Sequence, residues 1–575
     1  MTTDVHAHPV PFTLGYGRVL DALLGLRTLQ RRYESLPSGD FVAQALRTLD
    51  IRAEVDGLAR LPRDGGVIIT ANHPTGAMDG LLVLDAVRRV RPDVRVLGNR
   101  WLTRIPEMRE WTIPLDLYAP LPTQRLAALR EARRWVAKGG ALVVFPAGAV
   151  ARRFESGAPV DEPWSEGVLA LSRWTDAPIV PVHLGAQPTR GLRLAGRLHP
   201  WLTTAMLPRE LLNQAGARVP VRIGEAVSWP RLETFPSPAA RIAYLRARVA
   251  ALAAPQPRTV QAAPIAPEVL SSLVAREVAA LPRDCRLVEH GSFEVYCTPP
   301  DAIPLTLREI GRLRERTFRA IGEGTGQSTD LDEFDQRYLH LFLWNRSKSE
   351  IVGAYRMAPT RPGGPRLYTE TLFSWKRRPR TQIGDALELG RSFVRAEYQK
   401  DPASLLLLWR GIGAFVVRHP HCRRLFGPVS VSAEYSGPAR YLIARWLATR
   451  AQVNGEVQAR HEIARHPEID ELLDARSADT FAALDTMIRE FENGRGLPVL
   501  LRQYLRLNGR VLGVSRDPQF ADAMDALIVV DLLEMPVGHL ERYCGRVGAE
   551  RIRQHHAGLV DESSRFDEIR TKATA

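Results

Sequence analysis

The first half of the chain alternates between short apolar runs and segments in which apolar residues recur with helical spacing. Continuous apolar runs bounded by turn residues predict buried strands, and the recurring pattern predicts helices between them. The predicted strands are 67–70, 141–149 and 177–184, and the clearest helices are 126–137 and 163–173. Because strands and helices alternate along this half, it is predicted to form an α/β domain.

A change in composition marks the end of this domain. Alanine and proline dominate residues 253–267, which favours a linker, placed here at 256–282. The elements predicted after it are 305–320 (helix), 338–343, 351–356 and 387–394 (strands) and 404–418 (helix). No internal repeat relates the two halves. We therefore predict two unlike domains, an α/β domain at 1–255 and an α+β domain at 283–575.

Composition narrows the class of protein. Hydrophobic residues make up 45% of the chain and charged residues 25%, as in globular proteins. The net charge of +14 favours anionic partners, but only five of the 78 basic residues are lysines, a bias that genomic base composition also produces. Without a zinc-finger spacing or an aromatic RNA-binding pattern, we expect no nucleic-acid partner. Four widely spaced cysteines predict reduced thiols and no metal site.

Any membrane contact is expected to be peripheral. No apolar run reaches about 18 residues, and residues 1–11 lack the pattern of a secretory signal. We expect a cytoplasmic protein at the inner face of a bacterial inner membrane. The segment 15–36, where leucines alternate with arginines, is the candidate interfacial helix. Alternatively, it packs against the first domain as an ordinary amphipathic helix.

A histidine and a carboxylate follow the first predicted strand. Residues 72–79 read Asn-His-Pro-Thr-Gly-Ala-Met-Asp, which places His73 and Asp79 where a strand gives way to a helix. An imidazole can take the proton of a hydroxyl group, and a carboxylate can orient the ring and stabilise its cation. The alternative is a loop histidine capped by an aspartate.

The order of three blocks resembles the glycerolipid acyltransferases of the lysophospholipid acyltransferase superfamily. Residues 72–79 are similar to their Asn-His-x4-Asp motif, 145–148 to their Phe-Pro-Glu-Gly motif, and 177–184 to the Val-Pro-Val strand that follows. The resemblance implies that His73 is the general base and that Asp79 orients it. It also implies substrate contacts by the other motif residues, which are Asn72, Gly76, Phe145, Pro146 and Gly148.

Departures from the family pattern bear on the acceptor. One extra residue separates His73 from Asp79, Ala147 replaces the family's glutamate, and the arginine block that holds glycerol phosphate has no clear match in 100–116. These differences favour a branch associated with acylated amino-acid lipids and haemolysin-like proteins. Arg152, with Arg153 beside it, is a candidate to bind an anionic headgroup; the alternative is a solvated basic turn.

The second half resembles a different superfamily. Residues 285–535 are similar to the N-acyltransferase that makes lyso-ornithine lipid and, more distantly, to acyl-homoserine lactone synthases, which are GCN5-related acyltransferases. The residues whose spacing carries the resemblance are Arg314, Phe318, Asp332, Asp335, Arg356, Glu388 and Arg391, together with 497–507 and 517–520. The resemblance implies that they line the N-acylation site.

The chemistry of these residues agrees with that reading. Glu388, in an apolar strand, can accept a proton from an ammonium group so that the amine attacks a thioester. Arg391 would restrain that carboxylate or bind the carboxylate of the acceptor. Asp332 and Asp335 could hold the amino group. The alternative is a surface ion-pair cluster.

An incomplete match to a coenzyme A-binding loop bears on the identity of the acyl donor. Residues 410–413, Arg-Gly-Ile-Gly, partly match the loop that cradles the coenzyme A pyrophosphate in this superfamily, but Phe415 replaces a small residue. Arg410 is a candidate donor-binding residue. Because a carrier-protein phosphopantetheine has one phosphate, the incomplete loop favours acyl carrier protein over coenzyme A. No metal or redox cofactor is expected.

These patterns together predict a bifunctional acyltransferase. The second domain would move a 3-hydroxyacyl group from acyl carrier protein to the α-amine of an amino acid, with ornithine favoured. The first domain would then acylate the new 3-hydroxyl of this lyso-amino lipid. The alternatives are a lysophospholipid acyltransferase with an accessory domain and a membrane-active, haemolysin-like protein. The sequence identifies neither the amino acid nor the acyl-chain length.

Overall fold

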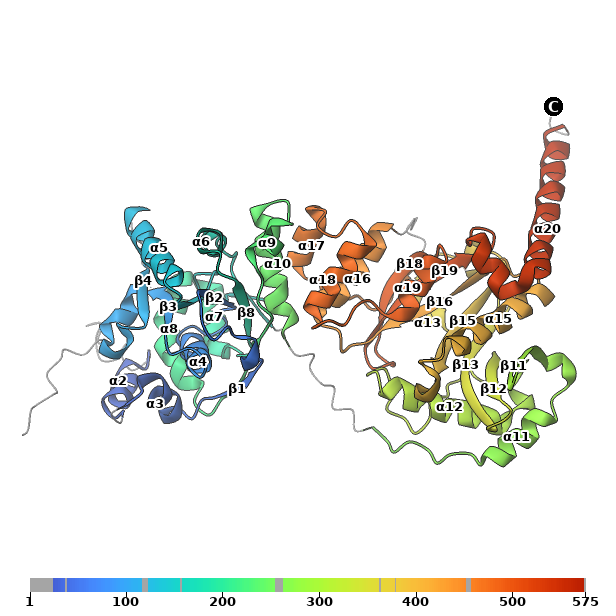
Figure 1. Ribbon diagram of the computed structural model, residues 1–575, viewed down its shortest axis with the longest axis horizontal. Coiled ribbons are helices and arrows are strands. Elements are labelled where there is room, and N and C mark those ends of the chain that lie inside the picture. Colours follow the sequence, from blue (N-terminus) through green and yellow to red (C-terminus); the bar gives the residue numbers. More distant parts are fainter. Residues whose placement is uncertain are drawn as a thin grey trace, which may run out of the picture. The chain divides into compact units, whose positions relative to one another are not determined.

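The computed structural model describes residues 24–36, 39–115, 122–155, 158–253, 262–360, 363–377, 379–450 and 457–572 (Figure 1). The chain forms two compact units. Unit 1 comprises 1–254, 436–439 and 466–495, and unit 2 comprises 255–435, 440–465 and 496–575. The predicted first domain did not include the later segments of unit 1.

Unit 1 is built on a mixed sheet. Its elements are α2 (Leu26–Glu34), α3 (Phe41–Thr48), β1 (Arg52–Asp56), β2 (Val67–Ala71), α4 (Ala77–Arg88), β3 (Val94–Asn99), β4 (Thr112–Leu115), α5 (Pro122–Ala137), β5 (Ala141–Val144), β6 (Arg153–Glu155), β7 (Ala158–Val160), α6 (Gly167–Thr175), β8 (Ile179–Leu184), α7 (Arg190–Leu198), α8 (Pro200–Asn213), β9 (Arg218–Ile223), α9 (Trp229–Glu233), α10 (Pro238–Ala251), α17 (Pro467–Asp474) and α18 (Phe481–Phe491).

The order of the strands brings three loops together. The sheet runs β1-β9-β8-β2-β5-β3-β4, and β2, β3, β4, β5 and β8 are parallel. β9 pairs with β8 in the antiparallel sense. Because parallel strands end at the same edge of a sheet, the loops that follow β2, β5 and β8 meet there. This carboxyl edge is where the predicted motifs of the first domain lie.

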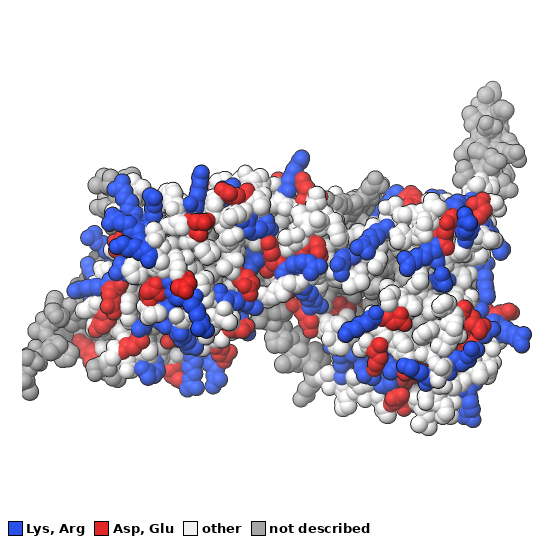
Figure 2. Space-filling view, viewed as in Figure 1, with Lys and Arg blue, Asp and Glu red and all other residues white. Residues whose placement is uncertain are grey.

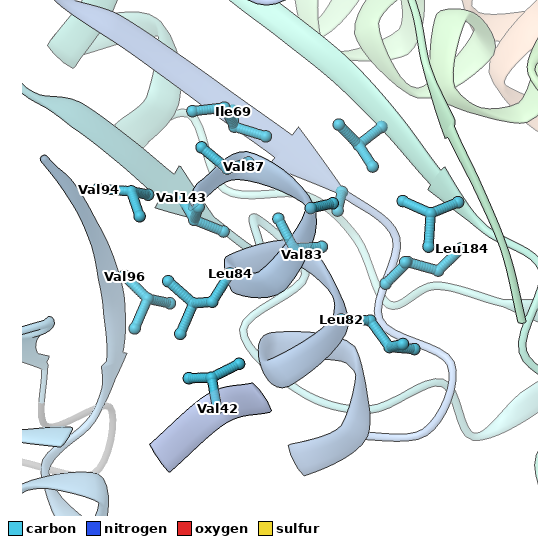
Figure 3. Packing of buried hydrophobic residues seen from close by; sticks show 14 of the residues in the cluster. Val42, Ile69, Leu82, Val83, Leu84, Val87, Val94, Val96, Val143 and Leu184 are labelled. Carbon is cyan, nitrogen blue, oxygen red and sulfur yellow. The ribbon is translucent and has the colours of Figure 1, made fainter. Parts of the chain in front are cut away.

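The core of unit 1 lies between the sheet and α4. Leu82, Val83 and Val87 on the helix pack against apolar side chains of the strands, such as Ile69 and Val143 (Figure 3). Strand residues alternate between the two faces of a sheet. The opposite face is covered by α5, α6 and α10 (Figure 1). Residues of the second half of the sequence complete this layer, since Glu490 of α18 pairs with Arg231 at 2.7 Å.

Unit 2 has more strands and a more antiparallel sheet. Its elements are α11 (Ser271–Ala279), β10 (Arg286–His290), β11 (Phe293–Thr298), α12 (Pro304–Arg319), β12 (Leu339–Asn345), β13 (Glu350–Pro359), α13 (Thr369–Leu372), β14 (Phe373–Trp375), α14 (Pro379–Ile383), β15 (Ala386–Val394), α15 (Pro402–Arg418), β16 (Arg424–Val431), α16 (Gly437–Arg450), β17 (Val457–Ala459), α19 (Val499–Arg506), β18 (Arg510–Asp517), β19 (Ala523–Asp531) and α20 (Val537–Lys572).

One parallel pair interrupts this antiparallel sheet. The strand order is β10-β11-β12-β13-β15-β16-β19-β18, and only β15 and β16 run parallel. They pair over three residues, Ala386–Glu388 against Arg424–Phe426, after which β15 continues beside β13 and β16 beside β19. α12 covers one face of the sheet through Ile310 and Leu313, and α15 covers the other.

The predicted fold class, two domains of α/β and α+β type, is confirmed. Part of the predicted linker is regular structure: residues 262–270 lead into α11, and Ala263 and Ala266 donate backbone hydrogen bonds to the loop after α12. The candidate interfacial helix 15–36 lies partly outside the described residues, and α2 is its described part.

Candidate active sites

The loop between β2 and α4 fixes one carboxylate. Asp79 lies in the first turn of α4, and its Oδ2 accepts the backbone N–H groups of Thr75 at 2.8 Å and Gly76 at 2.7 Å. The hydroxyl of Thr75 donates to Oδ1. Gly76 has a φ of 90°, and a Cβ there would lie 2.7 Å from Leu207. The extra residue of this motif is thus accommodated in a turn that requires glycine.

His73 is held beside this carboxylate. Its Nδ1 lies 2.9 Å from Asp79 Oδ2, a charge contact in which the N–H bond does not point along the line between the atoms. The imidazole stacks on Phe145, with ring centroids 4.4 Å apart. The side chain is 17% exposed, and Nε2 has no hydrogen-bond partner among the described residues. His73 can therefore present Nε2 to a hydroxyl group as a general base.

A second carboxylate, which the sequence analysis missed, holds the backbone of His73. Asp161 Oδ1 accepts the His73 N–H at 3.0 Å, and Oδ2 accepts the indole N–H of Trp164 at 2.9 Å. Burial raises the pKa of Asp161, while the bonds from His73 and Trp164 oppose that rise. The only sequence signal was an acidic pair before a proline, which is too common to single out.

The other predicted residues of unit 1 mostly shape the site. The amide of Asn72 exchanges two hydrogen bonds with the backbone of Leu184 and so joins the end of β2 to β8. The N–H of Gly148 closes a turn by donating to the carbonyl of Phe145 at 3.0 Å, so this amide is already used within the loop. The carbonyl of Pro146 accepts the N–H of Ser165.

Arg152 is already paired. Its Nε lies 3.1 Å from Glu162 Oε1, and its side chain is 28% exposed. Binding of an anionic headgroup by Arg152 stays a prediction, and the ion pair with Glu162 must then be shared or broken.

In unit 2, Glu388 is enclosed. Its Oε2 accepts the hydroxyl of Tyr338, and Oε1 accepts the backbone N–H of Thr369 at 2.8 Å. The residue is 1% exposed. Burial raises the pKa of Glu388, and the hydrogen bonds from Tyr338 and Thr369 partly oppose this. A carboxylate with a raised pKa is a better proton acceptor than a solvated one.

Arg391 occupies a bulge of the same strand. Its φ is 48°, unusual for a residue other than glycine, and the register of β13 and β15 shifts at this point. The guanidinium lies over the rings of Phe520, at 4.2 Å, and Tyr368, at 5.1 Å. Its Nε has no hydrogen-bond partner among the described residues, and its nearest carboxylate is Asp330 at 3.6 Å. Arg391 can thus still bind an anionic group.

The predicted aspartate pair, Asp332 and Asp335, forms ion pairs with buried arginines. Asp335 accepts both terminal nitrogens of Arg314, at 3.0 and 2.9 Å, and Arg356 lies 3.1 Å from it. Burial alone would raise the pKa of Asp335, but the charges of Arg314 and Arg356 outweigh it and lower the pKa. Asp335 therefore has no oxygen left for a substrate amine, contrary to our expectation. Asp332 bonds Arg356 through Oδ1, and its Oδ2 lies 3.8 Å from Arg391.

Two further predicted residues have structural surroundings. Phe318, on α12, packs edge-on against Phe520 and supports the ring that covers Arg391. Arg410 lies in the middle of α15, and no loop exists there. Gly411 and Gly413 allow close packing, since a Cβ on either would lie 2.5 Å from Val295 or from the backbone of Tyr543. The partial match of 410–413 to a pyrophosphate loop is therefore confined to the sequence, because these residues lie inside a helix.

Among the described residues, no helix combines the length and apolarity needed to cross a membrane. Two family models match the chain: "Acyltransferase" over residues 9–254 and "Acetyltransferase (GNAT) domain" over 313–410. The two matches fall in the two predicted domains and agree with the two resemblances read from the sequence.

Three relatives, with different printed activities, are each similar to part of the chain. The glycine N(alpha)-acyltransferase of Bacteroides thetaiotaomicron is 30% identical over 49% of this chain and 89% of its own length. The L-ornithine N(alpha)-acyltransferase of Rhodobacter capsulatus is 29% identical over 42% of this chain and 92% of its own. The lyso-glycine lipid O-acyltransferase of Phocaeicola vulgatus is 26% identical over 35% of this chain and 73% of its own.

Among solved structures, the 1-acyl-sn-glycerophosphate acyltransferase of Thermotoga maritima aligns with 41% of this chain and 81% of its own at 20% identity and a TM-score of 0.26, too low to support any argument. The chain is an acyltransferase that joins an acyltransferase domain to a GNAT domain, and it belongs to the family of the Bacteroides N(alpha)-acyltransferase.

Proposed function

We propose that the chain makes an amino-acid lipid in two acyl transfers, one in each unit. Unit 2 attaches a 3-hydroxyacyl group to the α-amine of an amino acid, and unit 1 acylates the 3-hydroxyl of that product. The observation that carries this proposal is that one chain holds two separate proton acceptors, Glu388 and His73, in domains whose relatives carry out N- and O-acylation.

In the first transfer, Glu388 accepts a proton from the ammonium group of the amino acid. The free amine attacks the thioester carbonyl, a C–N bond forms, and the C–S bond breaks to release the thiol. Arg391, which belongs to the same strand as Glu388, is placed to bind the carboxylate of the amino acid. Among the described residues, its Nε–H has no hydrogen-bond acceptor. Asp332 Oδ2 is the carboxylate oxygen beside it that remains open to the amine.

In the second transfer, His73 Nε2 removes the proton of the 3-hydroxyl as the oxygen attacks a second thioester. A C–O bond forms, the C–S bond breaks, and the imidazolium returns the proton to the departing thiolate. Asp79 stabilises the imidazolium at 2.9 Å. Stacking on Phe145 restricts rotation of the ring.

The favoured acceptor is ornithine and the favoured donor is acyl carrier protein. A carrier protein is acidic, and the chain carries a net charge of +14. We place the enzyme on the cytoplasmic face of the inner membrane.

Expression in a bacterium that lacks amino lipids, followed by mass spectrometry of the lipid extract, tests the proposal. The wild-type chain should yield a doubly acylated amino lipid, His73→Ala should accumulate the singly acylated form, and Glu388→Ala should yield neither. Each variant serves as the control for the other, because the two centres lie in different units. Acylation of lysophosphatidic acid without any amino lipid would establish an ordinary lysophospholipid acyltransferase instead.

A further inference from the structure

Helix α7 exposes an unusual mixture of side chains. Leu192 and Ala195 are buried, whereas Leu194 is 60% exposed and Leu198 is 67% exposed. Arg190 and Arg197 are exposed as well, and residues spaced by three, four and seven positions share one side of a helix. We call this set, Arg190, Leu194, Arg197 and Leu198, the α7 face. α7 itself contains no acidic residue.

α7 is anchored to the catalytic loop of unit 1. Its cap residue Thr189 donates its backbone N–H to Glu210 of α8 at 2.9 Å, which fixes the start of the helix. Near its end, a Cβ on Gly196 would lie 3.4 Å from Arg152. The residue before Arg152, Ala151, donates its N–H to the carbonyl of His73 at 2.9 Å. The helix that carries the α7 face is therefore connected, through Arg152 and Ala151, to the backbone of His73.

The side chains of the α7 face match one kind of partner. Exposed leucines beside arginines on a short amphipathic helix are suited to the boundary between lipid headgroups and acyl chains. Among the described residues, no carboxylate pairs with Arg190 or Arg197, so both guanidinium groups are open to lipid phosphates. A carrier protein would explain the arginines but not the two exposed leucines of this face.

We propose that the α7 face docks unit 1 on an anionic lipid bilayer. This surface is distinct from the segment 15–36. The inference goes beyond the two acyl transfers and does not require them, since it concerns binding of unit 1 to vesicles.

The test compares two charge-matched double variants of the full chain. Leu194→Glu/Arg197→Glu alters the α7 face, and Leu126→Glu/Arg130→Glu makes the same change in charge on α5, where Leu126 is 47% exposed. Figure 2 shows that basic side chains also gather over the part of unit 1 that carries α5 in Figure 1. The α5 variant is therefore a strict control for non-specific attraction.

Cosedimentation with vesicles of phosphatidylglycerol and phosphatidylcholine provides the readout. The affinity of the α7 variant for these vesicles should fall by at least about tenfold. The affinity of the α5 variant should stay within about twofold of that of the wild type. Both variants should keep the melting temperature of the wild type. Unchanged binding by the α7 variant, or equal losses by the two variants, overturns the proposal. Because this experiment measures vesicle binding and not acyl transfer, its result can be interpreted even if the proposed two-step activity is wrong.

Discussion

Glu388 and Arg391 are three residues apart on β15, yet both reach the segment Tyr368–Thr369. Glu388 accepts the N–H of Thr369 at 2.8 Å, and the guanidinium of Arg391 lies 5.1 Å from the ring of Tyr368. In a regular strand, residues with this spacing point to opposite faces. The bulge at Arg391, with its φ of 48°, brings both side chains to one side. A proton acceptor and an anion-binding group thus share one site.

Glu388→Gln tests the proton acceptor while keeping the shape of the side chain. We expect N-acylation by the purified enzyme to fall by about 100- to 10,000-fold, the usual contribution of a general base. Wild-type activity should rise with pH through the raised pKa of Glu388, because only the ionised carboxylate accepts a proton. The variant should lose this rise. A variant that retains it would show that another group titrates.

Tyr338→Phe provides a second, directional measurement at the same site. The hydroxyl of Tyr338 donates to Glu388 and lowers the pKa of its carboxyl against the effect of burial. Without that bond, the pKa rises further, so the acid limb of the pH–rate profile should move to higher pH. A shift to lower pH would contradict the assignment of the limb to Glu388. O-acylation in unit 1 should not change.

Asp161→Ala tests a positioning residue of unit 1. Asp161 accepts the N–H groups of His73 and Trp164, so its loss frees the loop that presents the imidazole. We expect kcat for O-acylation to fall by about 10- to 100-fold with little change in KM, since misplacement of a catalytic group mainly affects the chemical step. Measurements on a purified lyso-lipid check this.

The neighbouring substitution Glu162→Gln is the control for Asp161→Ala. It breaks the ion pair with Arg152 at 3.1 Å but leaves the contacts of Asp161 in place. O-acylation should then keep its kcat, and N-acylation should be unaffected in both variants. An equal fall in kcat for the two variants would show that the loop as a whole, and not Asp161, is responsible.

How far the sequence predicts such a site depends on the distance between partners along the chain. His73 and Asp79 are six positions apart at a strand-to-helix turn, and their contact follows from local geometry. Asp161 lies 88 residues from His73, and only the folded sheet brings them together. Likewise, the spacing of Arg314 and Asp335 marked them as site residues but did not show that the two side chains form an ion pair with each other.

Local patterns also misled where the same residues serve two structures. Glycines separated by one residue suit both a phosphate-binding loop and close packing within a helix. Gly411 and Gly413 lie in a helix, where they allow the close approach of Val295 and of the Tyr543 backbone. Neither of these neighbours is close to the glycines in sequence. The strand and helix positions were easier, because apolar periodicity is itself local.

Gly76→Ala tests the turn that aims Asp79. Alanine is strained at a φ of 90°, and its Cβ would lie 2.7 Å from Leu207. We expect a loss of about 1–3 kcal/mol in the free energy of unfolding and lower O-acylation. Gly80→Ala, one turn into α4, is the matched control, because no atom lies within 4 Å of a Cβ there. Chemical denaturation that ranks Gly80→Ala as the more harmful would contradict this account.

His340 makes unit 2 sensitive to acid. It is 1% exposed, and burial lowers the pKa of its imidazole to about 4 from 6.5, although the carbonyl of Asp335, 2.8 Å from Nε2, opposes this. Between pH 6.5 and about 4, the unfolded chain therefore binds a proton that the folded chain does not. The contribution of His340 to the free energy of unfolding is at its full value above pH 6.5. It falls by about 1.4 kcal/mol per pH unit as the pH is lowered to about 4.

Urea denaturation of wild type and His340→Gln at pH 7 and pH 4.5 isolates this contribution. The wild type should lose more stability on acidification than the variant, whereas His290→Gln, at an exposed position of β10, should behave like the wild type. Buried carboxyls with raised pKa values, such as Glu388, titrate in the opposite sense, but they are present in all three proteins and cancel in the comparison. Equal losses in wild type and His340→Gln would mean that His340 is already protonated in the fold.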